Sequence, residues 1–511
     1  MSDWTAGYLS EIGYTLGYYP ELNPLRLQLL LANASLACPE VGTACELGFG
    51  QGMSVNLHAA ASQVRWFGTD FNPAQAGFAR ELASASGAGA QLFDQSFAEF
   101  CSRPDLPDFD YIGLHGIWSW VSDENRAVIV DFIRRKLKVG GVLYASYNTQ
   151  PGWAAMVPMR DLLTRHGEVM GAAGQGIVSR IDGALDFAEK LLATNPTYAR
   201  ANPHVAERLK TIKGQDRNYV AHEYFNRDWL PMPFARMAEW LAPAKLNYAC
   251  SASHLDHIDP ANLTAEQQAF LKDIPDAMFR ETVRDFMVNQ QFRRDYWVRG
   301  ARRLNSLEQL EALRKLRVIL VQPRADVALT VTGSLGEATL QVAIAEPILE
   351  LLADHQAKTL GQIELAVKDK GVDFARLMQA VMVLTGAGSL VAVQDDATIA
   401  RARPQTDRLN AFLCDMARGR TDTSYLASPV TGGGVAAGRF QQLFLLAMNQ
   451  GLSQPADWAQ FVWQMLLAQG QRIIKEGKPL ESPEENVAEL SEQAQTFAEK
   501  QVPILIALGI A

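Results

Sequence analysis

The segment that decides the fold is ACELGFGQGMSVN, residues 44–56, in which an apolar run leads into three glycines and then a helical pattern. Gly48, Gly50 and Gly52 alternate with other residues, so they permit a tight strand-to-helix turn and a close approach of the backbone to a ligand. The spacing weakens both phosphate-binding patterns: a dinucleotide fingerprint requires glycine where Met53 stands, and no GK[ST] follows to complete a P-loop.

On both sides of this turn, short apolar runs alternate with helical patterns, which is typical of a parallel sheet covered by helices. We therefore expect an α/β fold with a Rossmann-like sheet. The predicted strands are 43–47, 64–69, 90–94, 109–115 and 141–148, and the predicted helices are 53–62, 73–86, 96–102 and 123–137, the last capped by the glycines of KVGG.

The rest of the chain divides by pattern. Residues 153–243 carry only amphipathic helical patterns, and strands return at 244–252 and 291–300. In the next part, three helices precede a short β run, GSLVAVQ, which we expect to pair with ATIARA, residues 397–402, in a winged-helix-like module. The predicted domains are 1–152 with 244–300 (sheet), 153–243 (helical insertion), 301–404 (middle regulatory domain) and 405–511 (C-terminal helical domain, broken by turn-rich 426–438).

Composition argues against several classes of protein. The 511 residues include 47 Lys and Arg against 56 Asp and Glu, a net charge of −9 that disfavours nucleic-acid binding. No secretory signal and no run of about 20 apolar residues is present, so we expect a cytoplasmic protein without a membrane span. Five cysteines lack any CxxC pair, so we expect reduced thiols and no metal site. The basic group in residues 292–303 we interpret as a solvated or salt-bridged edge.

The pattern E-x-G-x-G-x-G, which begins at Glu46, resembles the class I S-adenosylmethionine-dependent methyltransferases. The resemblance implies that Glu46 helps hold the amino-carboxypropyl end of S-adenosylmethionine, while the backbone from Gly48 through Phe49 and Gly50 to Gly52 passes beneath its ribose and methionine portion. A carboxylate suits the cationic amine of such a ligand, and glycine removes side chains that would block it. A structural role for Glu46 is the alternative.

Two residues follow the second predicted strand, where open α/β sheets bind ligands. Asp70 can accept both hydroxyls of a ribose, and Phe71 can stack on an adenine ring. The alternatives are an Asx-turn at Asp70, before Asn72, and a plain core position for Phe71.

The third predicted strand ends at Asp94. Its position resembles the one that accepts from the adenine amino group in this family, with Gln95 and Ser96 beside it. The alternative role of Asp94 is a helix N-cap.

The fourth predicted strand leads into LHGIWSWVSDEN, where the family places the methyl acceptor. We therefore expect His115, Trp118 and Trp120 to line the acceptor pocket, and His115 to contact the cofactor. His115 is either a catalytic base or part of the pocket wall, because methyl transfer depends chiefly on in-line positioning. The tetrapeptide [DN]PP[YF] of many amino-methylating enzymes is absent.

Two further clusters lie outside the predicted strands. NYVAHEYF, residues 218–225, places His222 and Glu223 at the end of the helical insertion, and GYTLGYYPELNP offers Tyr14, Tyr18 and Tyr19. Tyrosine rings and hydroxyls can hold an ammonium group or line a channel for a long side chain. The alternative is that these residues are buried and satisfy one another.

Over nearly its whole length the chain resembles a bacterial family of class I methyltransferases with a methyltransferase regulatory domain. Its known members include the rickettsial protein lysine methyltransferases that modify outer-membrane protein B. The resemblance rests on ACELGFGQG, GTDFNPAQ, LHGIWSWVS, NYVAHEYF, FRRDYWVRG and LASPVTGGG.

That resemblance implies S-adenosylmethionine as cofactor, S-adenosylhomocysteine as product, and a protein lysine as acceptor. It also implies a homodimer through the helical insertion, and an amine oriented by Tyr18, His222 and Glu223. Two other functions stay open at this point: a small-molecule O- or N-methyltransferase, and a non-catalytic cofactor-binding scaffold.

Overall fold

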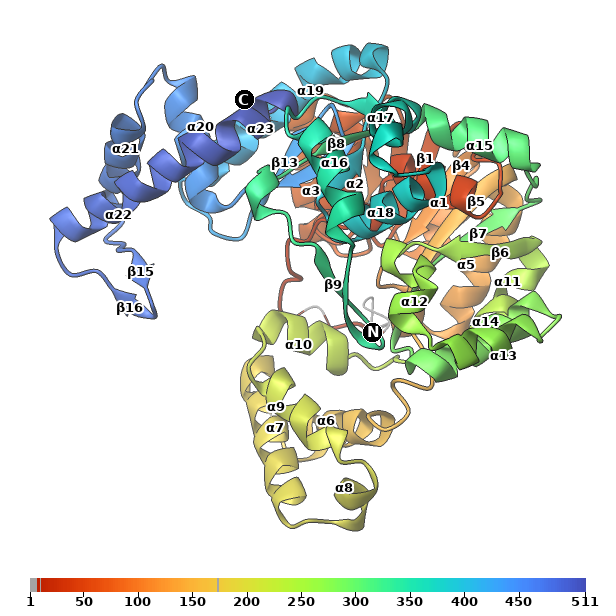
Figure 1. The fold of residues 1–511 in the computed structure, drawn as a ribbon. Helices are drawn as coiled ribbons and strands as arrows, with labels where there is room; N and C mark the ends of the chain where they lie inside the picture. Colours follow the sequence, from red (N-terminus) through yellow and green to blue (C-terminus); the bar gives the residue numbers. More distant parts are fainter. Residues whose placement is uncertain (1–6, 10, 172–173) are drawn as a thin grey trace.

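A computed structural model describes residues 7–9, 11–171 and 174–511, and its centre is a seven-stranded sheet (Figure 1). The strand order is β3-β2-β1-β4-β5-β7-β6, and β7 is antiparallel to both of its neighbours. The strands are β1 Thr43–Leu47, β2 Arg65–Thr69, β3 Gln91–Phe93, β4 Phe109–Leu114, β5 Leu137–Asn148, β6 Leu246–Ser251 and β7 Phe292–Arg299. The predicted Rossmann-like sheet is confirmed, and it includes both late strands.

The helices between the first five strands also agree with prediction. They are α2 Met53–Ala61, α3 Pro73–Ser86, α4 Phe97–Cys101 and α5 Asp123–Lys136. The predicted glycine cap of α5 is wrong: the helix ends at Lys136, and β5 begins directly at Leu137. Gly140, with φ +81°, instead lies where the pairing of β5 with β4 shifts register. The left-handed glycine therefore serves a strand irregularity and not a helix end.

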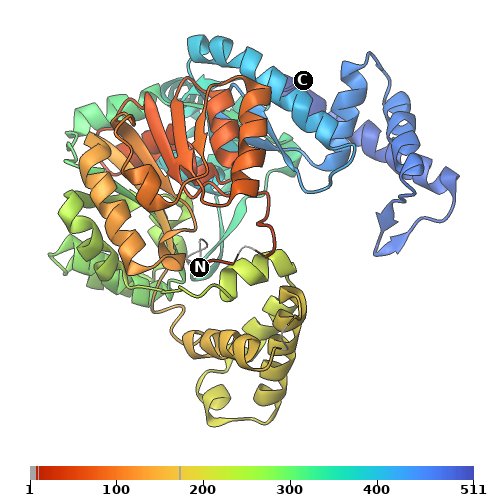
Figure 2. The same ribbon diagram turned by 180° about the vertical axis from the view of Figure 1, so that it is seen from behind.

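The helical insertion projects from the sheet and has its own hydrophobic core (Figures 1 and 2). It contains α6 Val157–Val169, α7 Ile177–Ala193, α8 Thr197–Ala201, α9 His204–Lys213 and α10 Arg217–Tyr224. α11 Phe234–Leu241 then returns to the sheet and packs on β6 and α14. Between β6 and β7 the chain forms α12 Asp259–Asn262, α13 Ala265–Lys272 and α14 Ala277–Val288.

The last three of the four helices in the middle region pack against a three-stranded sheet of order β11-β8-β12. Its elements are α15 Ser306–Lys315, β8 Arg317–Leu320, β9 Thr330–Gly333, β10 Gly336–Thr339, α16 Val342–Leu352, β11 Lys358–Thr359, α17 Leu360–Val367, α18 Phe374–Gly386 and β12 Leu390–Ala392. The predicted hairpin with ATIARA is wrong, because those residues begin the helix α19 Asp396–Met416 and β12 pairs with β8 instead. Asp395 caps that helix by accepting from the Thr398 N–H.

The C-terminal region is mostly helical, and α20–α22 project from the rest of the molecule in both views (Figures 1 and 2). It contains β13 Tyr425–Ser428, β14 Gly433–Ala436, α20 Arg439–Asn449, α21 Pro455–Ala468, β15 Ile474–Lys475, β16 Lys478–Pro479, α22 Pro483–Thr496 and α23 Val502–Ala507. The turn-rich stretch is thus largely the β13–β14 hairpin. This hairpin and α19 cover α2, all nine residues of which are buried.

The cysteines and the length of the helices can be compared with the predictions from composition. All five cysteines are free thiols, four of them buried. In the part of the chain that the structure describes, no helix has the length and apolar character required to cross a bilayer.

Candidate cofactor site

The turn between β1 and α2 forms the floor of the site. Gly48, Gly50 and Gly52 have φ values of +73°, +59° and +74°, a region that side chains other than glycine rarely adopt. A Cβ at Gly52 would lie 2.4 Å from the Cβ of Ala79, and one at Gly48 would lie 2.3 Å from Cδ1 of Ile117. Glycine is therefore required at positions 48 and 52 both by backbone conformation and by space, and at position 50 by backbone conformation.

Glu46 lies at the end of β1, immediately beside this turn. Its side chain is buried, and within the described residues its Oε2 atom has no hydrogen-bond partner. Burial, with a smaller contribution from Asp70, raises the pKa of this carboxyl to about 8. A buried carboxylate oxygen without a partner costs free energy unless a ligand supplies a donor, and a cationic donor satisfies it best.

Asp70 follows β2 and faces the same cavity. Its Oδ2 accepts from the Gly50 N–H at 2.9 Å and its Oδ1 from the Asn72 N–H at 3.0 Å. The Asx-turn alternative is thus present together with a position in the site. Burial raises the pKa of Asp70 to about 6, although the two backbone donors oppose that shift. Phe71, next in sequence, meets the ring of Tyr8 edge-on at 5.6 Å.

The structure brings most of the predicted cofactor residues together around one cavity. They are Glu46, Gly48, Phe49, Gly50, Gly52, Asp70, Phe71, Gln95, Ser96 and His115. Ser96 also caps α4 by accepting from the Glu99 N–H.

Asp94 is the exception, since it is absent from the lining of this cavity. Its carboxylate is half exposed and forms an ion pair of 2.7 Å with Arg80, which lowers its pKa. It does not cap a helix either, because that role belongs to Ser96. The residue ends its strand as predicted, but α3 supplies a guanidinium that holds the carboxylate away from the cavity.

His115 forms part of the cavity wall. Its ring stacks on Tyr19 at 3.7 Å, and its Nδ1 lies 2.9 Å from the hydroxyl of Tyr144. Burial lowers the pKa of His115 to about 4, so the ring is neutral at pH 7. This geometry favours a role for His115 in the cavity wall over a role as catalytic base, because a strongly lowered pKa makes the imidazole a weak proton acceptor.

Two predicted catalytic residues lie elsewhere. Trp118 is buried in the core beneath the sheet, where its Nε1 donates to Sδ of Met232 at 3.2 Å. Tyr18 is partly buried and packs against α2, with its hydroxyl 3.2 Å from Nε2 of His58. Neither lines the cavity. In each case a near neighbour does so instead: Trp120 for Trp118, and Tyr19 for Tyr18.

His222 and Glu223 lie behind the cavity and connect it to the helical insertion. His222 Nε2 is 2.9 Å from the Ile12 carbonyl, and its ring lies against Tyr8 and Tyr14 at 5.4 and 5.2 Å. Glu223 accepts a long hydrogen bond from Asn148 at 3.5 Å, and burial raises its pKa to about 7. Neither side chain reaches the lining.

The N-terminal segment, defined here as residues 11–19, crosses the cavity and supplies Tyr14 and Tyr19 to its wall. The Tyr14 ring lies edge-on to His222 at 5.2 Å, and the Tyr19 ring stacks on His115. Tyr8, just before this segment, lines the cavity too but was not singled out from the sequence, although it belongs to the same tyrosine-rich stretch. Sequence pattern cannot tell which tyrosines of an irregular segment face inward, since no helical or strand period applies to it.

Comparisons with known proteins agree with this geometry. An uncharacterised protein of the cyanobacterium Synechocystis, sll1526, is 42% identical over 99% of this chain and 100% of its own length. The chain belongs to the same family. A family model described as a predicted methyltransferase regulatory domain matches residues 216–299, which run from α10 to the end of β7. The predicted regulatory domain, 301–404, lies outside that match.

Solved structures show the same fold. PKMT2 of Rickettsia typhi, in complex with AdoHcy, is 19% identical and has a TM-score of 0.70, with 97% of this chain and 100% of that chain covered. A second structure of PKMT2 gives 20% identity and a TM-score of 0.71, with 98% and 100% covered. This chain therefore shares the fold of PKMT2 over nearly its whole length.

Proposed function

We propose that the protein is an S-adenosylmethionine-dependent methyltransferase whose acceptor is a lysine side chain of another protein. The observation that carries the cofactor assignment is the buried, unpartnered Oε2 of Glu46 beside three left-handed glycines. S-adenosylmethionine presents an α-ammonium group that would satisfy this oxygen, and it supplies an electrophilic methyl group on a positively charged sulfur.

The other residues of the cavity fit the remaining parts of that cofactor. Asp70 has an oxygen geometry that can accept from both ribose hydroxyls, and Phe71 offers a flat apolar face to the adenine. Gln95 and Ser96 provide polar atoms at the adenine edge in place of Asp94. The glycine turn lets the backbone pass close beneath the ligand.

The acceptor side of the cavity is aromatic. Tyr8, Tyr14, Tyr19, His115 and Trp120 surround it, and Trp120 donates from Nε1 to the Glu223 carbonyl at 3.3 Å. An enclosed aromatic site favours the neutral form of a lysine amine by desolvation, and only the neutral form carries the electron pair for methyl transfer. His222 then positions Tyr8 and Tyr14 from behind, the Glu223 carbonyl holds Trp120, and neither side chain touches the amine.

A protein acceptor is further supported by the likeness to PKMT2 and by the resemblance to the rickettsial lysine methyltransferases. The helical insertion exposes Val169, Met170 and Phe187, which supports the predicted homodimer. A cytoplasmic location remains our prediction and agrees with the free thiols.

The test is transfer of radiolabelled methyl from S-adenosylmethionine into size-fractionated lysate of the source organism. Label in a discrete protein band, mapped to lysine and lost with Asp70→Asn, is the expected result. Label only in the low-molecular-weight fraction would overturn the lysine proposal and favour a small-molecule methyltransferase. Cofactor binding without any transfer would favour the scaffold.

A further inference from the structure

A second cavity, of about 430 Å³, lies at the far edge of the sheet. It is lined mainly by β6, β7, α13, α14 and the segment 256–263, and nearly all of its lining falls within the stretch that the regulatory-domain family model matches. It shares no residue with the cofactor cavity. Its size is in the range of cavities that hold small metabolites.

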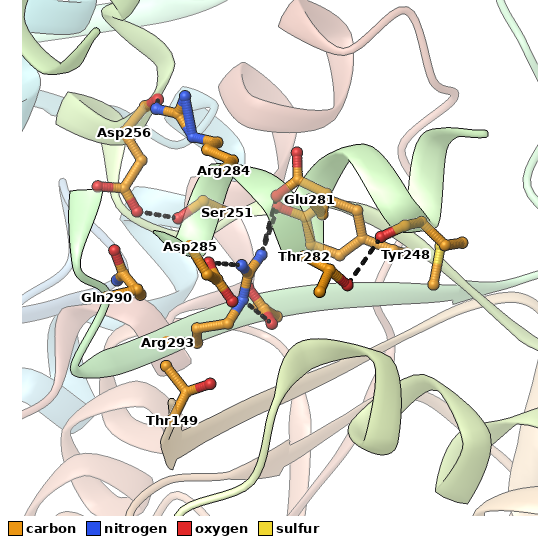
Figure 3. A network of polar contacts seen from close by, with 12 residues as sticks. Thr149, Tyr248, Ser251, Asp256, Glu281, Thr282, Arg284, Asp285, Gln290 and Arg293 are labelled. Carbon is orange, nitrogen blue, oxygen red and sulfur yellow. Dashed lines mark hydrogen bonds and ion pairs between the residues drawn. The ribbon is translucent and has the colours of Figure 1, made fainter. Parts of the chain in front are cut away.

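The wall of this cavity contains a group of charges around Arg293, in which Arg293, Asp285 and Asp295 are buried and Glu281 is partly exposed (Figure 3). The guanidinium contacts Asp295 at 2.9 Å and Glu281 at 3.0 Å, and it pairs with Oδ1 of Asp285. Of the two expectations for this basic group, the salt-bridged one holds for Arg293 and the solvated one does not, because its side chain is only 5% exposed. Three carboxylates therefore share one guanidinium, and when all are ionised they leave an excess negative charge in a buried place.

One oxygen of this group is unused. Asp285 is 2% exposed, and within the described residues its Oδ2 has no hydrogen-bond partner, although its Oδ1 is paired with Arg293. Burial also raises the pKa of Asp285 to about 7, with Asp295 and Glu281 adding to the shift and Arg293 opposing it. A positive charge at Oδ2 would remove both the unsatisfied acceptor and the excess charge.

We propose that this cavity binds a small organic molecule through a primary ammonium group that donates to Oδ2 of Asp285. An organic cation fits better than a metal ion, because within the described chain no three His, Cys, Asp or Glu side chains are placed to hold a metal. The guanidinium of Arg293 would also repel a compact dication. Lys272 and Arg280 line the same cavity and suit a carboxylate at the other end of the ligand, as in a free amino acid.

The test is isothermal titration calorimetry of the full chain, saturated with S-adenosylhomocysteine so that the cofactor part of the first site is filled. Amine that binds on the acceptor side of that site is recognised because Asp285→Asn leaves its affinity unchanged. The probes are putrescine, free L-lysine and a lysine-containing peptide, which separate a simple diamine, an amino acid and a protein side chain as sources of the ammonium. We expect saturable binding of one molecule per chain for at least one probe. Asp285→Asn lowers the affinity by about tenfold to a hundredfold, the worth of a charged hydrogen bond.

Asp131→Asn is the matched control, because Asp131 also pairs with arginines but lies exposed on α5. It leaves the affinity unchanged. Since Asp285→Asn also disturbs the Arg293 group, Ala249→Phe provides a second variant that fills the cavity and leaves those charges intact. Wild-type protein that no probe saturates would overturn the proposal, as would a folded Ala249→Phe variant that binds the amine as tightly as wild type.

Discussion

The raised pKa of Glu46 predicts how the free energy of unfolding depends on pH. Because its folded pKa is raised to about 8 from an ordinary value near 4.5, the folded protein binds a proton more tightly than the unfolded chain. In the absence of cofactor, the free energy of unfolding therefore falls as pH rises from about 5 to about 8. Urea unfolding at several pH values measures this slope. Glu46→Gln makes the slope shallower, and an equal slope in both proteins would contradict the assignment.

Asp70 and Asp94 form a matched pair for cofactor binding. Both end a strand of the same sheet edge, but Asp70 faces the cavity and Asp94 is paired with Arg80 outside it. We expect Asp70→Asn to weaken S-adenosylhomocysteine binding by about tenfold or more, because charged hydrogen bonds to the ribose are lost. Asp94→Asn should change the affinity less than about twofold, since exposed ion pairs contribute little. Calorimetry of both variants decides, and a large effect of Asp94→Asn would show that its side chain turns inward on binding.

The direction in which the Asp70 and Asp94 side chains point could not be predicted from the sequence. Strand ends place Asp70 and Asp94 equally well, because a parallel sheet brings its carboxyl ends to one edge. Which carboxylate faces inward depends on Arg80, from the neighbouring helix, and no local pattern encodes that contact. The same limit applies to Tyr18 and Trp118, since neighbouring side chains in turns and irregular segments follow no fixed period.

At the level of elements, the sheet was predictable because buried parallel strands give continuous apolar runs between glycine turns. The ATIARA segment was not, because its alternating pattern suits a strand. Asp395 caps it as a helix, and β12 is already paired with β8. The helix cap at Asp395 and the pairing of β12 with β8 thus outweighed the alternating pattern that favoured a strand in ATIARA.

The docking of the β13–β14 hairpin on α2 is a testable element contact. A Cβ added at Gly433 would lie 2.3 Å from the hydroxyl of Tyr18 and 2.8 Å from Nδ2 of Asn23, which pack beside α2, and 3.4 Å from Cδ2 of His58 in α2 itself. Gly433→Ala should therefore lower the free energy of unfolding by about 1–3 kcal/mol through overpacking. Gly77→Ala is the control: nothing lies within 4 Å of an added Cβ on that exposed helix position, and alanine should stabilise by about 0.5–1 kcal/mol. Thermal or urea unfolding compares them, and equal stability of the two variants would refute the contact.

For the whole molecule, the exposed apolar side chains of the insertion predict its oligomeric state. Val169, Met170 and Phe187 all belong to the α6–α7 end of the insertion. If this surface joins two copies, Phe187→Asp should shift a dimer to a monomer, because a charge would be buried in an apolar contact. Light scattering after size exclusion measures the mass. A wild-type monomer at all concentrations, or a Phe187→Asp dimer, would exclude this interface.

The N-terminal segment couples the cofactor cavity to the insertion. It is held at one end by Glu11 with Arg180 and by His222 at the Ile12 carbonyl, and at the other by the Tyr19 N–H, which donates to Ser54 of α2. Between these points Tyr14 and Tyr19 line the cavity. A ligand that contacts Tyr14 and Tyr19 stabilises the folded position of residues 11–19 by its binding free energy, so local unfolding of this segment becomes rarer.

We therefore expect S-adenosylhomocysteine to slow amide hydrogen exchange in residues 11–19 and in α10, although α10 supplies no residue to the cavity wall. The helices α21 and α22, which project from the rest of the molecule in Figures 1 and 2, should exchange at unchanged rates. His222→Ala should remove the protection of α10 and leave that of the glycine turn, because the turn contacts the ligand directly. Protection confined to the turn in wild-type protein would mean that the insertion does not respond to the cofactor, and the tyrosines would then be a fixed wall.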